Sequence, residues 1–253
     1  MADRAPAPGS PVSRGGFFPP TRWSVVEAAR SADAKERARG MESLASVYWR
    51  PVYKHIRLKW QKDHDDASDL VQDFFVDLAE RELLLRFDPS RARLRTYLRV
   101  CVDGLVSNAA KAGVRVKRGG GAAHLSLDFE AVRDELERSG PGAGESAEDA
   151  FEREYRRSVL AVAVDRLEAQ LRTGGKERTF QLFAAHDLSA EVEPPSYAAL
   201  SERFGVSVSD VTNQLFLARR ELKRIAIALL EALSGSDEEL RAEARALLGQ
   251  PRP

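Results

Sequence analysis

The chain has 253 residues, of which 43% are hydrophobic and 31% are charged. This composition supplies enough apolar side chains for a buried core, and the length fits one or two domains of ordinary size. Lysine plus arginine and aspartate plus glutamate each number 39, so the formal net charge is zero. A uniformly basic nucleic-acid coat is therefore excluded, although charge can still be segregated along the chain.

Reactive and metal-binding residues are few. Cys101 is the single cysteine, which excludes an intrachain disulfide and a cysteine-cluster metal site, and the four histidines lack the spacing of metal ligands. We therefore expect neither metal nor another cofactor. No apolar run reaches the length of a membrane span, and the first residues lack the apolar segment of a signal peptide. The expectation is a cytoplasmic protein without membrane insertion.

Apolar periodicity predicts helices along most of the chain. Residues 1–20 contain five prolines and no periodicity, so we expect a disordered N-terminal extension there. Beyond them, apolar residues recur at spacings of three, four or seven, which favours amphipathic helices, and no stretch alternates as a strand does. The predicted helical segments are 21–60, 65–81, 94–112, 124–136, 151–171, 176–186, 196–204, 207–233 and a short frayed one in 236–249.

The predicted fold class is all-α, with two small helical bundles joined by a flexible linker. Residues 21–112 form the first bundle and residues 151–233 the second. The linker is 113–150, because its two ends are rich in glycine. A tail of residues 234–253 follows the second bundle.

Charge is segregated within the first bundle. From Lys62 to Glu82, eight acidic and two basic residues give a net charge of −6, and from Arg86 to Arg118, nine basic and two acidic residues give +7. Asp65, Asp69, Asp73 and Asp77 are spaced four apart, so they form one helical stripe whose neighbouring charges repel by roughly 0.2–0.5 kcal/mol per pair. We interpret the two runs as a protein-docking stripe beside a nucleic-acid face. Each run alone equally fits a solvated helix face.

The basic run also contains an aromatic residue. Thr96, Tyr97 and Asn108 interleave with the arginines. Such a combination suits single-stranded nucleic acid, because arginine binds phosphate while an unstacked base stacks on an aromatic ring.

Residues 197–215 fit a helix-turn-helix. Gly205 supplies the turn, Ser201 is small where the helices cross, and Ser207 can cap the second helix. The second helix would enter the major groove and expose polar side chains at its N-terminal end, with basic side chains further along to hold phosphate. The polar residues are Ser207, Ser209, Asp210, Thr212, Asn213 and Gln214, and the basic residues are Arg219, Arg220, Lys223 and Arg224. Any small three-helix core can mimic this pattern.

Three segments in this order resemble the extracytoplasmic-function group of sigma-70-type RNA polymerase sigma factors. They are residues 65–78 (DDASDLVQDFFVDL), 87–111 (FDPSRARLRTYLRVCVDGLVSNAAK) and 195–225 (PSYAALSERFGVSVSDVTNQLFLARRELKRI). The segments 21–26, 48–57 and 118–128 look like a branch of that group with a lengthened N-terminus and linker. The likeness covers residues 21–233 and leaves only the two ends outside it.

The resemblance implies a role for each segment. The first bundle would be the sigma region-2 domain and the second the region-4 domain, with core RNA polymerase and promoter DNA as partners. The block that docks on the polymerase matches Asp66, Asp69, Leu70, Gln72, Asp73 and Phe74. The block that recognises the −10 element and captures an unstacked base matches Arg93, Arg95, Thr96, Tyr97, Arg99, Asn108 and Lys111. The helix-turn-helix would read the −35 element through the residues named above.

The chain departs from the family pattern at two places. Tyr97 replaces the usual tryptophan of an Arg-Thr-Trp-Leu run. In the second helix of the helix-turn-helix, Thr212, Phe216 and Leu217 stand where the family often has lysine and a His-Arg or similar pair. Fewer bases then face the groove, which puts use of the −35 element in question, and Phe216 and Leu217 could instead bury against a partner or the preceding helix.

Three functions follow as hypotheses. The first is a sigma factor that binds core polymerase, recognises a promoter, opens DNA and starts transcription without catalysing a reaction itself. The second is a DNA-binding regulator that uses only the helix-turn-helix and acts without polymerase. The third is a sigma-like polymerase-binding module that has lost −35 reading. Factors of this group are often held by an anti-sigma protein, so the resemblance also implies an anti-sigma factor or another regulator as a partner.

An enzyme finds little support in the sequence. Cys101 falls on the apolar face of a helix, as a core residue does. The His64 side chain lies between acidic neighbours in a surface cluster, and Gly119 to Gly121 lack the Lys-Ser/Thr of a phosphate-binding loop. We therefore expect a protein that is not an enzyme.

Overall fold

The computed structural model describes residues 23–80, 83–112, 127–139, 145–189, 191 and 193–249, apart from the side chains of residues 111 and 112. Within these residues the fold is all-helical, as predicted, and contains no strand. The elements are α1 (Ser24–Ala29), α2 (Ala34–Lys59), α3 (His64–Glu80), the 3₁₀ helix η1 (Leu83–Arg86), α4 (Leu94–Ala112), α5 (Phe129–Ser139), α6 (Ala147–Thr173), α7 (Glu177–Asp187), α8 (Tyr197–Phe204), α9 (Val208–Leu233) and α10 (Asp237–Leu248). The predicted disordered extension, residues 1–20, lies outside the described residues.

Local sequence explains where several helices begin. Asp33, Ser146, Ser196, Ser207 and Ser236 each occupy an N-cap position, and the side chain of each accepts a hydrogen bond from a backbone N–H of the first turn. Such caps satisfy N–H groups that have no partner inside the helix, and each typically stabilises the helix by about 1 kcal/mol.

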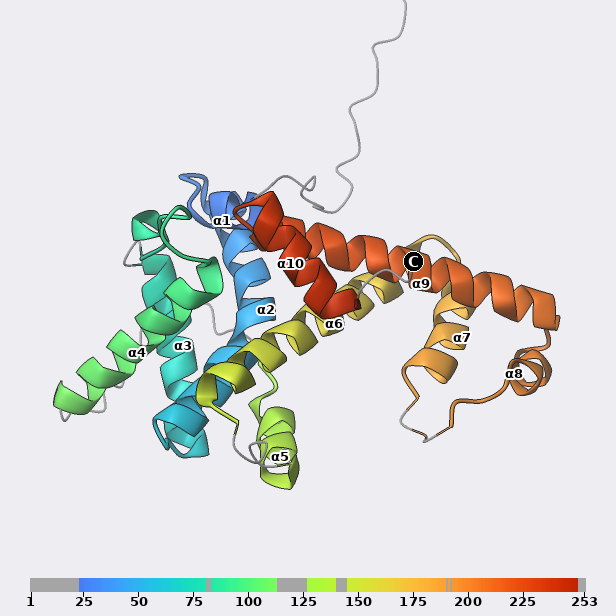
Figure 1. Cartoon of the computed structure of the whole chain (residues 1–253), viewed down its shortest axis with the longest axis horizontal. Coiled ribbons are helices and arrows are strands. Elements are labelled where there is room, and N and C mark those ends of the chain that lie inside the picture. The colour runs from blue at the N-terminus through green and yellow to red at the C-terminus, as the bar shows by residue number, and fades with distance from the viewer. Residues whose placement is uncertain are drawn as a thin grey trace, which may run out of the picture.

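Helix α6 is the centre of the packing. Its first half crosses α2, where the rings of Tyr48 and Tyr155 stack with centroids 5.4 Å apart. Its second half lies along α9, where the Arg224 guanidinium donates to the Gln170 side chain at 3.0 Å. Figure 1 shows α6 and α9 running between the end that holds α3 and α4 and the end that holds α8. The two helices therefore connect both ends of the molecule.

The buried apolar side chains of the described residues form one continuous cluster that extends from α1 to α9. Helices α2 and α6 contact each other, as do α1 and α9, so segments assigned to different bundles are packed together. The division into two bundles with a flexible linker between them stays a prediction. Part of that linker, residues 113–126 and 140–144, lies outside the described residues.

Two segments expected to be weakly structured are helices with specific contacts. Helix α5 lies in the predicted linker, and its Phe129 ring packs against Trp49 and Tyr53 of α2 at centroid distances of 5.3 and 5.6 Å. Helix α10 lies in the predicted tail and buries Glu243, which is only 4% exposed. Helix α10 is therefore packed on the rest of the fold.

None of the helices in the described residues has the length and hydrophobicity of a membrane-spanning segment.

Candidate nucleic-acid interface

Helix α4 carries most of the residues predicted to bind the −10 element, but it distributes them over different sides. An α-helix turns about 100° per residue, so Arg95 lies roughly opposite Tyr97, and Arg99 lies roughly opposite Asn108. The Asn108 side chain is exposed, whereas Arg95 is only 6% exposed. The structure therefore does not gather the predicted residues on one open surface. Lys111 is in α4, but its side chain lies outside the described part of the chain.

Tyr97 is held within the first bundle. Its hydroxyl donates to the backbone carbonyl of Leu83 at 2.6 Å, and its ring packs against Phe87 with centroids 5.1 Å apart. Burial is the main reason that the pKa of Tyr97 rises to about 12, so the phenol is neutral at physiological pH. The ring is half-buried, as is the neighbouring Thr96 side chain. Only part of the Tyr97 ring is therefore accessible to a stacked base in this arrangement.

The arginines near the start of α4 are paired with glutamates. The Arg95 Nε donates to Glu152 of α6 at 2.7 Å, and its Nη2 lies 2.7 Å from Glu243 of α10. The Arg93 guanidinium lies 3.6 Å from the same Glu243 carboxylate, and Arg99 lies 3.2 Å from Glu148 of α6. Burial lowers the pKa of Arg95, but the nearby Glu243 and Glu152 outweigh it, so the net pKa is raised and the charge is retained.

The acidic stripe lies along α3. Asp65 and Asp69 are exposed, and Asp66, Leu70, Gln72 and Asp73 are half-buried. The Asp66 carboxylate lies 3.7 Å from Lys62. Phe74 differs from the other residues predicted to bind polymerase, because it is fully buried and packs its ring against Phe75 at 5.2 Å. Phe74 therefore belongs to the core beneath the acidic face.

The predicted helix-turn-helix, residues 197–215, falls on α8 and the start of α9, and α7 packs beside both helices. Gly205 ends α8 in the left-handed conformation, with φ of 62°, and the Ser201 hydroxyl donates to the Val206 carbonyl at 2.5 Å. Glycine adopts positive φ without the steric cost that a Cβ brings. Leu200, Val211 and Leu215 are fully buried between the helices. Gly205 therefore lies at the turn, as the sequence predicted, and the three apolar side chains pack the two helices together.

Two predicted DNA-reading residues act as the cap of α9. The Ser207 Oγ accepts from the Asp210 N–H at 3.1 Å, and the Asp210 carboxylate accepts from the Ser207 N–H at 3.3 Å. This reciprocal arrangement is a capping box, which satisfies N–H groups at the helix start. The Ser207 hydroxyl also donates to the Asp210 carboxylate at 2.7 Å. Both side chains thus have a structural role, although they remain exposed.

The other predicted residues of α9 differ in how freely they face solvent. Ser209 and Asn213 are exposed, and so is Thr212, whose hydroxyl bonds the Val208 carbonyl at 3.0 Å. Gln214 is half-buried, and its side-chain oxygen accepts from Thr179 of α7 at 3.0 Å. Gln214 therefore connects α9 to α7 and is directed away from the exposed side of α9 that carries Ser209 and Asn213.

The basic residues further along α9 differ in how closely they are held in ion pairs with carboxylates. The Arg219 guanidinium donates to both carboxylate oxygens of Asp187 in α7, the closest contact being 2.9 Å. Arg220 is 63% exposed and lies 3.7 Å from Glu221, and Lys223 is exposed. Arg220 and Lys223 are the side chains that can reach a phosphate without breaking a short ion pair.

Phe216 does not bury against the preceding helix. It is 66% exposed on α9, whereas Leu217 is half-buried. Phe216 lies one turn beyond Thr212 and Asn213, on the same outer side of the helix. The exposed side of α9 that was predicted to read DNA is therefore partly apolar.

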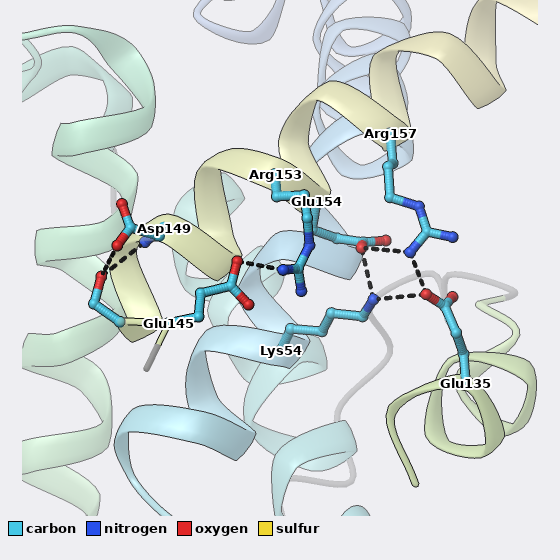
Figure 2. Close-up of polar contacts among 8 residues, drawn as sticks. Lys54, Glu135, Glu145, Asp149, Arg153, Glu154 and Arg157 are labelled. Atoms are coloured by element: carbon cyan, nitrogen blue, oxygen red, sulfur yellow. Dashed lines mark hydrogen bonds and ion pairs between the residues drawn. The ribbon is translucent and has the colours of Figure 1, made fainter. Parts of the chain in front are cut away.

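Sequence reasoning missed a set of charges that joins α2, α5 and α6. Figure 2 shows Lys54 directed toward Glu154 and Glu135, with Arg157 beside both carboxylates. The Lys54 Nζ lies 2.6 Å from Glu154 and 3.2 Å from Glu135, and Arg157 also pairs with Glu135. Nearby, Arg153 pairs with Glu145. Helical spacing places Lys54 on the apolar face of α2, and a lysine on such a face is a sequence signal for a buried ion pair. The sequence does not reveal which carboxylates pair with Lys54.

No protein-family model, curated protein or solved structure matches this chain.

Proposed function

We propose that this chain is a sigma factor of the extracytoplasmic-function type, which binds core RNA polymerase and directs promoter recognition and DNA opening. The observation that carries the proposal is that two surfaces suited to different partners lie at opposite ends of the molecule (Figure 1). One end has a helix-turn-helix whose second helix exposes Ser209, Asn213 and Lys223. The other end has the acidic face of α3 next to the arginine-rich start of α4.

Each surface suits a partner through ordinary chemistry. A helix-turn-helix places its second helix in the major groove of duplex DNA, where amide side chains read adenine and cations hold phosphate. The repelling carboxylates of α3 are relieved by a basic protein surface. The arginines near the start of α4 suit the phosphates of a single strand, and the accessible part of the Tyr97 ring suits an unstacked base. A subunit that positions polymerase on a promoter requires all three kinds of contact.

A regulator that acts without polymerase is the less favoured alternative. It would need only the helix-turn-helix of α8 and α9, and it gives no role to the acidic stripe of α3. The third candidate, a polymerase-binding module that has lost −35 reading, is favoured by two observations. Phe216 is 66% exposed on the outer side of α9, and Gln214 is turned toward Thr179. Both reduce the polar surface that could read bases.

A pair of equilibrium measurements tests the proposal. Fluorescence anisotropy would compare binding of the labelled full chain to purified core polymerase with its binding to duplex DNA in the absence of polymerase. We expect tight binding to core, and weak, strongly salt-dependent binding to duplex alone. Absence of core binding, or tight sequence-specific binding to duplex without polymerase, would contradict the proposal and favour the free regulator.

Two charge reversals on α3 locate the polymerase contact. Asp69→Lys changes an exposed residue of the acidic stripe, and Glu80→Lys makes the same change of charge at the exposed end of the same helix. We expect Asp69→Lys to weaken core binding by about tenfold or more, since a like-charge contact at an interface costs several kcal/mol. The Glu80→Lys protein should bind core polymerase about as tightly as the wild type does. Equal effects of the two changes would reject α3 as the docking face.

A further inference from the structure

Helix α10 begins at a sharp boundary after α9. Ser234 to Ser236 separate the two helices, and the Ser236 hydroxyl accepts from the Glu239 N–H at 3.1 Å. Gly235 lies against the Trp23 ring, where an added Cβ would be only 2.2 Å from a ring carbon. The start of α10 is thus seated in a defined place, and Leu240, Ala244 and Leu247 pack against the buried cluster.

The docked α10 brings two carboxylates to the arginines that precede and begin α4. Glu243 lies 2.7 Å from Arg95 and 3.6 Å from Arg93, and Glu239 lies 3.8 Å from Arg95. The side chains of Glu243 and Glu239 are 5% and 11% exposed, and that of Arg95 is 7% exposed. These contacts join α10, the last helix of the described residues, to arginines about 150 positions earlier in the sequence.

The carboxylates of α10 occupy the guanidinium edges that a phosphate would use. Carboxylates and phosphates both bind guanidinium through paired N–H donors, so the two kinds of anion compete for Arg95. Arg95 is covered while α10 is docked, so a polyanion cannot reach it without displacing the helix. Among the described residues, Glu152 of α6 is the carboxylate that would remain on Arg95, at 2.7 Å.

Docking of α10 depends on a balance between its packing contacts and the cost of burying its charges. A 12-residue helix is marginal in water by itself, so α10 depends on its contacts with the rest of the fold. Those contacts include buried charges, and the cost of removing such charges from water offsets much of their mutual attraction. A segment with this balance at the end of the described fold can leave without separating α2, α4 and α6.

We propose that α10 is an intramolecular cover that competes with single-stranded nucleic acid for the arginines of α4, and that it must leave before that strand can bind. This inference rests on the proposed function, because it regulates the surface assigned there to the opened promoter strand. Nucleic acid and the docked helix then exclude one another, and each lowers the apparent affinity of the chain for the other.

Matched variants of the full chain test the cover. Glu243→Gln keeps the shape of the side chain but removes the charge that pairs with Arg95, whereas Glu238→Gln makes the same change at an exposed position of α10. A third variant ends the chain after Gly235 and so lacks α10. Circular dichroism and urea denaturation verify that each variant is folded, and anisotropy measures binding of a fluorescent single-stranded oligonucleotide at low salt without polymerase.

We expect Glu243→Gln to bind the oligonucleotide about fivefold or more tightly than the wild type, within the usual range of coupling between sites. The truncated chain should bind at least as tightly as Glu243→Gln, and Glu238→Gln should bind as the wild type does. Equal binding by all four proteins would overturn the cover, and so would equal gains from Glu243→Gln and Glu238→Gln, since that pattern reflects net charge alone.

The proposed function has a separate readout, which is transcription with core polymerase. If the wild type starts transcription and the variants show no gain in oligonucleotide binding, the cover is wrong and the sigma assignment stands. If Glu243→Gln and the truncated chain gain affinity but no variant supports transcription, the cover stands and the sigma assignment fails.

Discussion

The Nζ atom of Lys54 lies 2.6 Å from a carboxylate oxygen of Glu154, and the two residues are 100 positions apart in the sequence. Their side chains are 3% and 1% exposed, so the ion pair is buried where α2 crosses α6 (Figure 2). This crossing sets the position of α6, which in turn carries Glu148 and Glu152 to the arginines of α4. The pair therefore connects the core of the fold with the candidate nucleic-acid surface.

Removing the Lys54 charge should destabilise the protein strongly. Lys54→Met leaves the Glu154 carboxylate buried without its closest cation, and breaking such a pair costs about 3–5 kcal/mol. We expect the free energy of unfolding to fall by about 3 kcal/mol, the lower end of this range, because Arg157 remains 3.6 Å from the Glu154 carboxylate. Urea denaturation measures the free energy of unfolding.

Two further variants give the Lys54 measurement its controls. Lys35→Met makes the same replacement at an exposed position of α2 and should change the free energy of unfolding by less than about 0.5 kcal/mol. The double variant Lys54→Met/Glu154→Leu removes both buried charges and should recover much of the lost stability. A Lys54→Met protein as stable as the Lys35→Met protein would contradict the structural role of the pair.

Two glycines should respond in opposite directions to replacement by alanine. Gly205 has φ of 62° at the turn of the helix-turn-helix, so Gly205→Ala imposes a left-handed conformation that costs about 1–2 kcal/mol. Gly104 lies inside α4 with open space around its Cβ position, so Gly104→Ala should stabilise the protein by about 0.5–1 kcal/mol. Thermal melts monitored by circular dichroism compare the two, and stabilisation by Gly205→Ala would reject the turn.

Adjacent residues of α9 should affect different properties. Asn213→Ala removes an exposed amide and should weaken recognition of a −35 duplex by the complex with polymerase, by about 1–3 kcal/mol for a specific base contact, without loss of stability. Gln214→Ala removes the partner of Thr179 and should lower the free energy of unfolding by about 1 kcal/mol. Promoter-binding titrations and urea denaturation separate the two effects. Reversed effects would show that α9 faces DNA with a different side.

Asp103 should make stability depend on pH in the acid range. Burial raises the pKa of Asp103, but hydrogen bonds from Lys59, Trp60 and His55 outweigh it, so the net pKa lies below the ordinary value. The lowered pKa means that Asp103 contributes stability above its unfolded-state pKa, about 3.9, and loses that contribution as pH falls through the folded-state pKa.

A comparison of the wild type with Asp103→Asn isolates the contribution of the Asp103 carboxylate to stability. The wild type should be more stable than the variant at pH 7, and the difference in free energy of unfolding should shrink as pH is lowered below about 4. Urea denaturation at a series of pH values gives this difference directly. A difference that stays constant or grows in acid would show that the Asp103 contacts do not favour the ionised carboxylate.

The sequence predicted most of the secondary structure because capping residues and apolar spacing are local signals. Ser207 and Gly205, for example, indicate the start of α9 and the turn before it. Contacts between distant segments have no such local signal. Arg95 has the same kinds of sequence neighbours as any basic helix face. Its burial follows from residues of other helices, among them Glu152 of α6 and Glu243 of α10.

The candidate site illustrates the same limit. Periodicity places Gln214 near the start of the helix that was predicted to read DNA, but the Thr179 contact that turns it inward depends on how α7 packs against α9. Likewise, helical geometry alone already separates Arg95 from Tyr97 around α4, a conclusion that could have been drawn from residue spacing. The contacts of α10 with the arginines could not have been predicted in this way, because the acidic sequence of α10 is equally typical of a solvated tail.

The most direct test of the sigma assignment is transcription by purified core polymerase on fragmented genomic DNA of the source organism, with and without the full chain and its α10-truncated form. We expect discrete new start sites that share upstream sequences and appear only when the chain is present. Core binding without new start sites from either form would contradict the assignment and favour a polymerase-binding module.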